Sequence, residues 1–403
     1  METFHENENI ETEKKSKNIF DNIKSKYVLQ KIFNYPKRNK SLEIIKYNKK
    51  NQERMDLNIN DFKEYCELYS SIQIEIIPAK NKYGTFIHIK NEEEEYYHIF
   101  FNDSKKEIER AYFDKDDKVN KIKIIIDYPI KSFKYLFHCI GWIESVNFKR
   151  FYRTNIIDMS YMFNGCFSLK EVVFPTFNGI NLTDMKFMFN SCASIKEINL
   201  SDFNAYNVKS MRGLFNNCFS LEKINLSNFK TDKVHDMSFM FFNCRPLNEL
   251  NLPNFKTDEV SNISFMFFNC SSLKELNIST FNIKNVRDMS SMFKNCIKLE
   301  ELDLSMPKYD HFYLKMKSMF SGCESLKKVN LSNLEPYFVG DMSYMFRNCI
   351  SLQEINLTNL KQTEHCHTFG MLGAYPRNYR LRATFEAYNL YLSEYAFSDC
   401  PEP

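Results

Sequence analysis

The sequence predicts an α/β solenoid, a right-handed coil with a parallel β-sheet along one face and short helices along the opposite face. The first observation is an internal repeat, because one cysteine recurs six times at a spacing of 26 residues and once at 27. The second observation is that each repeat has two halves with different hydrophobic periods. The recurring cysteines are Cys166, Cys192, Cys218, Cys244, Cys270, Cys296, Cys323 and Cys349.

The two halves of one repeat predict two kinds of local structure. In residues 221–229, Ile224 and Leu226 alternate as on a strand with one buried face. In residues 234–247, apolar residues follow at spacings of three and four, which is typical of one side of a helix. Asp236 stands where the N-cap of that helix is expected.

The regular cysteines favour packing over disulfide formation. Residues that share one position of a repeat stack inside the solenoid, where a free thiol behaves as a small apolar group. Buried free thiols suit a reducing compartment. The chain starts at Met1 without the apolar stretch of a secretion signal, so we expect an unprocessed, cytoplasmic protein.

The rest of the chain divides by composition and period. Residues 72–77, 86–89, 96–101 and 122–126 read as strands, and we expect at least the last of them to cover the first edge of the solenoid. The array begins near Ile130, in phase with the later repeats. The predicted parts are a disordered tail over 1–20, a helical module over 21–69, a β-rich cap over 70–128, a solenoid of about nine 26-residue coils over 129–372 and a C-terminal cap over 373–403.

The repeat motif resembles a known family. The run Asp-Met-Ser-x-Met-Phe-x-x-Cys-x-Ser-Leu-x-x-Leu-x-Leu-Ser-x-Phe is carried most fully by residues 158–177, 288–305 and 341–360. It is similar to the BspA-like leucine-rich repeat, the 26-residue repeat of bacterial surface proteins. The resemblance covers residues 130–372 and implies a leucine-rich-repeat solenoid.

The helical module has a second resemblance. Residues 27–35 and 42–52 resemble an F-box, in which a Leu-x-x-Ile-Phe helix precedes a shorter helix. An F-box ahead of leucine-rich repeats implies a substrate receptor that docks a ubiquitin-ligase adaptor through residues 21–69. The module is also basic, which is typical of a phosphate- or lipid-binding surface, and the alternative is a lysine-rich, solvated helix face.

Several classes of function are disfavoured. The sequence has no nucleophile motif, zinc-protease motif or glycine-rich phosphate loop, so we expect no enzyme and no cofactor. His365, Cys366 and His367 are the one metal-like cluster, and without a second ligand pair we expect no metal site. A net charge of +3 gives no general attraction to nucleic acid. No apolar run is long enough to span a membrane, and we expect a monomer.

The predicted binding site lies on outward positions of the strands. These positions form an asparagine ladder beside a mostly acidic ladder. Repeat solenoids bind partners on such extended concave faces. The alternative is that the asparagines stabilise the sheet and bind nothing. The candidate residues are Lys223, Asn225, Glu249, Asn251, Glu275, Asn277, Glu301 and Asp303.

We therefore predict a non-catalytic scaffold that binds a protein partner of unknown identity on the concave strand face. One alternative is the F-box-type substrate receptor of a ubiquitin ligase. Another is a surface adhesin, which the missing secretion signal disfavours.

Overall fold

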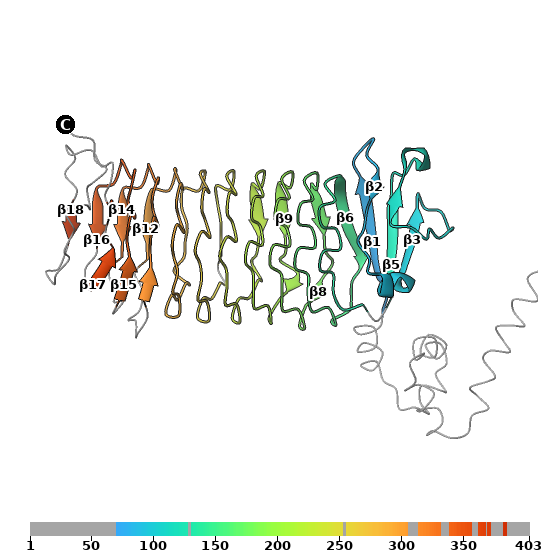
Figure 1. Ribbon diagram of the computed structural model, residues 1–403, viewed down its shortest axis with the longest axis horizontal. Coiled ribbons are helices and arrows are strands. Elements are labelled where there is room, and N and C mark those ends of the chain that lie inside the picture. The colour runs from blue at the N-terminus through green and yellow to red at the C-terminus, as the bar shows by residue number, and fades with distance from the viewer. Residues whose placement is uncertain are drawn as a thin grey trace, which may run out of the picture. The chain divides into compact units, whose positions relative to one another are not determined.

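The computed structural model divides the chain into two units, residues 1–70 and 71–403, and describes most of the second. The described part of the second unit is a stack of coils that follows a small β-sheet (Figure 1). The predicted tail and helical module lie outside the described residues. The structure describes residues 70–127, 130–252, 255–304, 313–331, 338–356, 362–367, 369–371 and 382–384.

A five-stranded sheet opens the second unit, in the order β3–β5–β1–β6–β7. Strands β1 (Ile72–Pro78), β3 (Tyr97–Phe101) and β5 (Ile122–Ile126) alternate buried residues with half-buried or exposed ones, as their period of two predicts. β1 pairs antiparallel with β5 on one side and with β6 (Ile143–Arg150) on the other. The strand that meets the solenoid is therefore the first of this module, whereas the sequence suggested the last.

The remaining elements of this part are short. Residues 86–89 were expected to form a strand, but only β2 (Gly84–Thr85) is present there, paired with β4 (Tyr112–Phe113). Phe86 and Ile87 are nevertheless buried. The described residues contain two helices, the 3-10 turns η1 (Asn91–Tyr96) and η2 (Lys115–Asp117).

Parallel strands line one face of the solenoid, although not in every coil. β6 pairs with β7 (Glu171–Val173), and β9 (Glu197–Asn199) pairs with β11 (Lys223–Asn225). The next run, in order, is β12 (Glu301–Asp303), β14 (Lys328–Asn330), β16 (Glu354–Asn356) and β18 (Arg382–Thr384). The equivalent residues 249–251 and 275–277 are described but are not assigned as strand.

A second line of short parallel strands follows the first. It contains β8 (Phe177–Asn178), paired with β10 (Phe203–Asn204). A separate sheet, made of β13 (Tyr313–Lys315), β15 (Phe338–Asp341) and β17 (Gln362–His367), lies at the next position of the later coils. Isolated parallel bridges join this same position in the earlier coils, from Ser132 to Lys315 of β13, so the regular stacking begins close to Ile130.

The predicted short helices are absent from the described coils, where consecutive turns take their place. In residues 159–166, the amides alternate between two kinds of partner. Met162 N–H donates to Met159 within its own coil, whereas Phe163 N–H donates to Met188 in the next coil. Tyr161 (φ 58°) and Gly165 (φ 77°) adopt the left-handed conformation, which cannot continue an α-helix. Every turn amide is thus paired without a helix.

The core is built from ladders of identical residues. Nine phenylalanines from Phe137 to Phe346 stack with ring centroids 5.4–5.8 Å apart and interplanar angles of 3–21°. All eight repeat cysteines are buried and free, which confirms the prediction of packing thiols. Each Sγ donates to the carbonyl oxygen of the phenylalanine in the preceding coil, at 3.0–3.2 Å. The thiol therefore ties neighbouring coils together.

Candidate interaction surfaces of the solenoid

The first candidate surface is the strand face predicted from the sequence. All eight predicted residues are exposed there: Lys223, Asn225, Glu249, Asn251, Glu275, Asn277, Glu301 and Asp303. In β11 and β12 they flank Ile224 and Leu302, which point inward. The structure thus places the predicted residues on one line of outward positions.

Many charges on the strand face are paired between coils. Lys327 Nζ lies 2.6 Å from Glu300 Oε2, and Lys328 Nζ lies 3.4 Å from Glu354 Oε2. Exposed pairs of this kind contribute little to stability, up to about 1 kcal/mol each. Glu249 and Glu275 make no ion pair with any described residue. The middle coils therefore present two uncompensated carboxylates.

The asparagines of the strand face accept hydrogen bonds from the backbone. Asn225 Oδ1 accepts a hydrogen bond from Ser227 N–H at 3.1 Å, and Asn277 Oδ1 accepts one from Ser279 N–H at 3.0 Å. Such bonds fix the turn that follows each strand. Asn330 Nδ2 also donates to Asp303 Oδ1 at 3.2 Å. This geometry supports the interpretation that these asparagines stabilise the coil.

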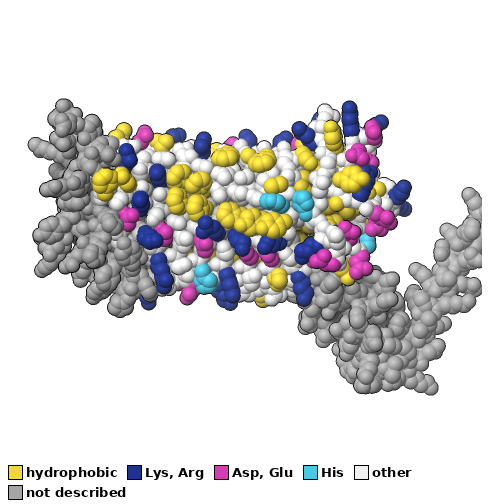
Figure 2. Space-filling view, viewed as in Figure 1, with side chains coloured by type: hydrophobic (Ala, Val, Ile, Leu, Met, Phe, Trp, Pro, Cys, Tyr) yellow, Lys and Arg dark blue, Asp and Glu magenta, His cyan; other side chains and the backbone are white. Residues whose placement is uncertain are grey.

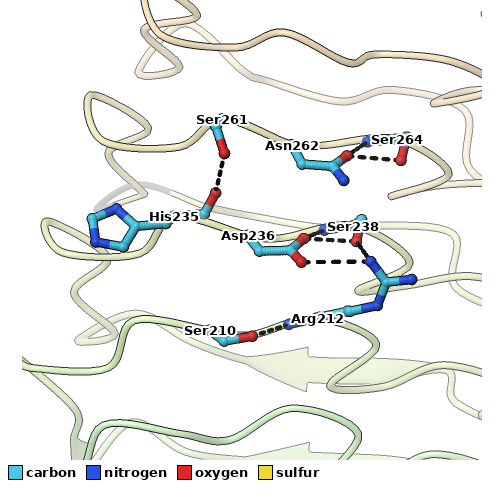
Figure 3. A network of polar contacts seen from close by, with 8 residues as sticks. All are labelled: Ser210, Arg212, His235, Asp236, Ser238, Ser261, Asn262 and Ser264. Atoms are coloured by element: carbon cyan, nitrogen blue, oxygen red, sulfur yellow. Dashed lines mark hydrogen bonds and ion pairs between the residues drawn. The ribbon is translucent and has the colours of Figure 1, made fainter.

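The second surface is the turn face, formed by the consecutive turns, and it carries a polar ladder along one border (Figure 3). Asp236 Oδ1 accepts hydrogen bonds from Ser238 N–H at 2.8 Å and from Ser238 Oγ at 2.6 Å. Asn262 does the same for Ser264 in the next coil. Asp236 thus caps the backbone amide two residues after it, as a helix N-cap would, although no helix begins there.

Arg212 links two coils of this ladder. Its Nη1 donates to Ser238 Oγ at 3.0 Å and lies 3.5 Å from Asp236 Oδ2 (Figure 3). Its guanidinium also lies over the Phe239 ring, 5.0 Å from the centroid. The arginine is therefore held flat along the turn face, between the polar ladder and the aromatic residues beside it.

Aromatic rings cover much of the turn face, a feature that the sequence analysis missed. Tyr161 stacks 5.0 Å from Tyr135 and 5.3 Å from Phe187. Further along, two pairs of rings stack between neighbouring coils. The ring centroids of Phe239 and Phe265 are 4.8 Å apart, and those of Phe242 and Phe268 are 4.6 Å apart. Tyr135 is 41% exposed and the others are half-buried. We call this set the aromatic stripe: Tyr135, Tyr161, Phe187, Phe239, Phe242, Phe265 and Phe268.

Positively charged side chains lie against the aromatic stripe. Lys134 Nζ is 5.2 Å from the centroid of the Tyr135 ring, and Lys294 Nζ is 6.0 Å from that of Phe268. Figure 2 shows a face on which hydrophobic side chains gather in bands across the coils, with Lys and Arg side chains beside them. A cation over an aromatic face is attracted by the ring quadrupole, so these pairs place positive charge next to the stripe.

The sequence did contain a signal for this stripe. The third residue after each capping position is Tyr135, Tyr161, Phe187, Phe239, Phe265 or Tyr344 in most coils, and Gly213, Ser291 or Ser318 in the others. Read as a helix, this position follows the buried Met by two residues and faces solvent. Read as a turn, it is the left-handed residue that projects outward.

The metal-like cluster and the repeat thiols are the remaining candidates from the sequence. Within the described ranges, no group of three His, Cys, Asp or Glu side chains could hold a metal ion. The side chains of His365, Cys366 and His367 lie outside the described set. Burial raises the pKa of Cys218 and of Cys270 to about 12, so these thiols stay protonated and unreactive at neutral pH. No helix among the described residues is long and apolar enough to cross a membrane.

Comparisons with known proteins address the repeats. The family model described as "Mycoplasma protein of unknown function, DUF285" matches residues 131–244, 220–312 and 312–374. Among solved structures, a leucine-rich repeat protein from Bacteroides ovatus ATCC 8483 is 15% identical, with a TM-score of 0.31, and covers 72% of this chain and 88% of that chain. No curated protein matches the sequence. The family match spans the stretch in which the sequence predicts the repeats.

Proposed function

Since the chain belongs to the family described as Mycoplasma protein of unknown function, DUF285, whose description assigns no activity, we propose from its surfaces that it is a non-catalytic scaffold that binds a protein partner. The site that the geometry supports best is the aromatic stripe on the turn face. The strand face, which the sequence favoured, is the second candidate.

The observation that carries this proposal is two rows of outward aromatic residues, five at the third position after the cap and two at the sixth. Large aromatic side chains supply most of the energy of protein interfaces, and a rigid ring loses little conformational entropy on binding. The stacks hold the rings fixed before a partner arrives, since the planes of Phe239 and Phe265 are within 6° of parallel. A surface prepared in this way is typical of a recognition site.

The charges beside the stripe indicate the chemistry of the partner. Lys134, Arg212 and Lys294 each lie within about 6 Å of an aromatic centroid. An acidic segment with apolar side chains would match both features, with its apolar groups on the rings and its carboxylates near the cations. We therefore propose an acidic, apolar polypeptide segment as the occupant.

The strand face remains a candidate because of Glu249 and Glu275. Their carboxylates are exposed and make no ion pair with a described residue, in contrast to the paired Glu300 and Glu354. A basic partner would find its charge complement there. This surface lacks large aromatic anchors in the middle coils, so we expect weaker and more salt-sensitive binding.

One comparison separates the two faces. Phe239→Ser combined with Phe265→Ser removes two rings, and Ser291 and Ser318 already occupy the same position with φ 55° and 54°. Glu249→Gln combined with Glu275→Gln changes the strand face alone. Proteins that co-purify with each full-length variant are quantified by mass spectrometry against the unmodified chain.

We expect the serine variant to lose a partner that the glutamine variant keeps. The reverse result would move the site to the strand face. If both variants keep every partner, neither surface is the binding site.

Three further interpretations stay predictions. The F-box-type receptor depends on residues 21–69, which lie outside the described residues, and the adhesin and the cytoplasmic location depend on features of the sequence alone. Recovery of a ubiquitin-ligase adaptor with the full chain would favour the receptor. Its consistent absence would count against that role.

A further inference from the structure

Cys139 differs from every other cysteine that the structure describes. The eight repeat cysteines are buried, whereas Cys139 is exposed at the start of the solenoid. It precedes Ile140, which occupies the buried position that a cysteine holds in the later coils. This thiol therefore has no packing role of the kind that explains the others.

The Cys139 thiol has an imidazole partner. Cys139 Sγ lies 3.3 Å from His138 Nε2, and Asn164 Nδ2 lies 2.9 Å from His138 Nδ1. Asn190 Nδ2 in turn donates to Asn164 Oδ1. An amide that donates to Nδ1 leaves the proton of the neutral ring on Nε2, which then points at the sulfur. The nucleophile and the imidazole from one coil, the orienting amide of Asn164 from the next and Asn190 from the third thus form a connected chain.

The protonation state of His138 fits this arrangement. Partial burial and the neighbouring His88 lower the pKa of His138 below its ordinary value, so the neutral ring is favoured at neutral pH. His88 Nε2 also lies 2.8 Å from the His138 carbonyl oxygen, which holds the backbone in place. A neutral ring can donate its Nε2 hydrogen to a thiolate and stabilise it.

The backbone at Cys139 is in an unusual conformation for a cysteine. Its φ is 57°, in the left-handed region, where later coils place asparagine, as at Asn217, Asn243 and Asn269. Gly165 makes room for it, since a Cβ on Gly165 would lie 3.2 Å from Cys139 Sγ. A strained residue with a reactive side chain is typical of a functional position.

We propose that Cys139 is a nucleophilic thiol that forms a mixed disulfide with a disulfide-bearing ligand. The thiol releases its proton to water, and the His138 Nε2–H stabilises the resulting thiolate. The thiolate sulfur attacks one sulfur of the ligand, so a new S–S bond forms as the old one breaks. The other half of the ligand leaves as a thiolate and takes a proton from water. No further oxidant is required.

Access to the site is open on the turn face. The Tyr135 ring packs 5.2 Å from the His138 ring, so the thiol lies at the beginning of the aromatic stripe. A small disulfide or a disulfide in an exposed peptide could therefore reach Cys139. The buried thiols are closed to both classes of ligand.

The test follows individual cysteines in the folded, full-length chain. The protein is mixed with 5,5′-dithiobis(2-nitrobenzoic acid), cystine or a disulfide-bonded peptide, the reaction is quenched over time, and each modified cysteine is located by peptide mass spectrometry. We expect Cys139 to form a mixed disulfide while the eight repeat cysteines react only after unfolding. Reaction with cystine but not with the peptide would identify small disulfides as the ligand, and the reverse would identify a polypeptide.

Two variants with precedents in the chain complete the test. Cys139→Asn copies Asn295, whose side chain lies over Gly322 in the same way, and His138→Asn copies Asn164 and Asn190 at the equivalent position. We expect His138→Asn to slow modification of Cys139 about tenfold, because the imidazole N–H no longer lies beside the attacking sulfur. An unchanged rate of mixed-disulfide formation in His138→Asn would overturn the proposal. It would also be overturned if Cys139 of the folded chain reacts no faster than Cys139 of the unfolded chain.

Discussion

Gly213 shows how a single residue shapes the turn face. It adopts φ +57° at the position where other coils place an outward aromatic ring. A Cβ on Gly213 would overlap the Phe187 ring, which leans over the glycine from the preceding coil. The glycine therefore serves two purposes, because it relieves the left-handed backbone and gives the Phe187 ring a place to lie.

Replacement of this glycine should be costly. We expect Gly213→Ala to lower the free energy of unfolding by about 3 kcal/mol, of which the left-handed alanine contributes roughly 1–2 and the overlap with Phe187 the rest. Urea unfolding followed by circular dichroism measures the loss.

The double variant Gly213→Ala with Phe187→Ser separates the two causes. Removing the ring should restore the part of the loss that comes from the overlap, as a non-additive term in a double-mutant cycle. Strict additivity of the two substitutions would contradict the role assigned to Phe187.

The capping position of each turn segment should also respond to substitution. Asp236→Ala removes the acceptor for two hydrogen bonds from Ser238 and the carboxylate beside Arg212. We expect a loss of about 1 kcal/mol in the free energy of unfolding. Asp236→Asn is the matched control, because Asn262 makes the same two bonds, and it should stay within about 0.5 kcal/mol of the unmodified chain. Equal losses in both variants, by urea titration, would argue against a capping role.

At the scale of an element, the turn segments show what the sequence could not decide. Spacings of three and four place Met237, Met240 and Cys244 on one side of a helix, and they do the same for a ladder of consecutive turns. The deciding residues are Phe239 (φ 60°) and Asn243 (φ 61°), which break the helix. Asparagine is common in the left-handed conformation, so its presence can indicate one. Phenylalanine rarely adopts that conformation, so its presence in the sequence does not indicate a left-handed turn. The buried residues were therefore predictable from the sequence, while the backbone was not.

One segment lacks the cap that its neighbours have. Lys315 occupies the position of Asp288 and Asp341, and its side chain cannot accept a hydrogen bond from an amide. We expect Lys315→Asn to raise the free energy of unfolding by about 1 kcal/mol, since the new amide oxygen can accept the Lys317 N–H. Asparagine between two aspartates has a precedent in Asn262, which lies between Asp236 and Asp288. Lys315→Gln is the control, because its amide is too far from the backbone, and an equal gain there in thermal unfolding would contradict the capping explanation.

At the scale of the whole molecule, the period of the sequence determined most of the fold. The recurring cysteine and phenylalanine positions identified the inward ladders, and Ile130 and Phe133, which the sequence places in phase with the repeats, are buried as well. The candidate site was less predictable, because the chosen strand positions are exposed as expected but several serve the fold, as Asn225 does. The aromatic stripe was missed because an outward position of a helix and a left-handed turn residue have the same spacing.

The stacked thiols give the molecule a collective dependence on pH. Burial raises the pKa of all eight repeat cysteines above the ordinary value of 9.0. Well below pH 9.0 the folded and unfolded chains both hold these protons, so the stabilisation is complete. Above pH 9.0 the unfolded chain releases them while the folded chain retains them, and the free energy of unfolding must fall as the pH rises toward the folded values, about 12 for Cys218 and Cys270.

The expected dependence is steep because the thiols titrate together. Each contributes a slope that approaches about 1.4 kcal/mol per pH unit, so eight of them should unfold the chain within a narrow alkaline range. Urea titrations between pH 7.5 and 10 measure this slope. Cys244→Ser with Cys270→Ser is the control, since serine does not titrate and the slope should fall by about a quarter. A free energy of unfolding that stays constant from pH 8.5 to 10 would show that the ladder is hydrated, because only thiols sealed from water keep their protons as the unfolded chain loses them.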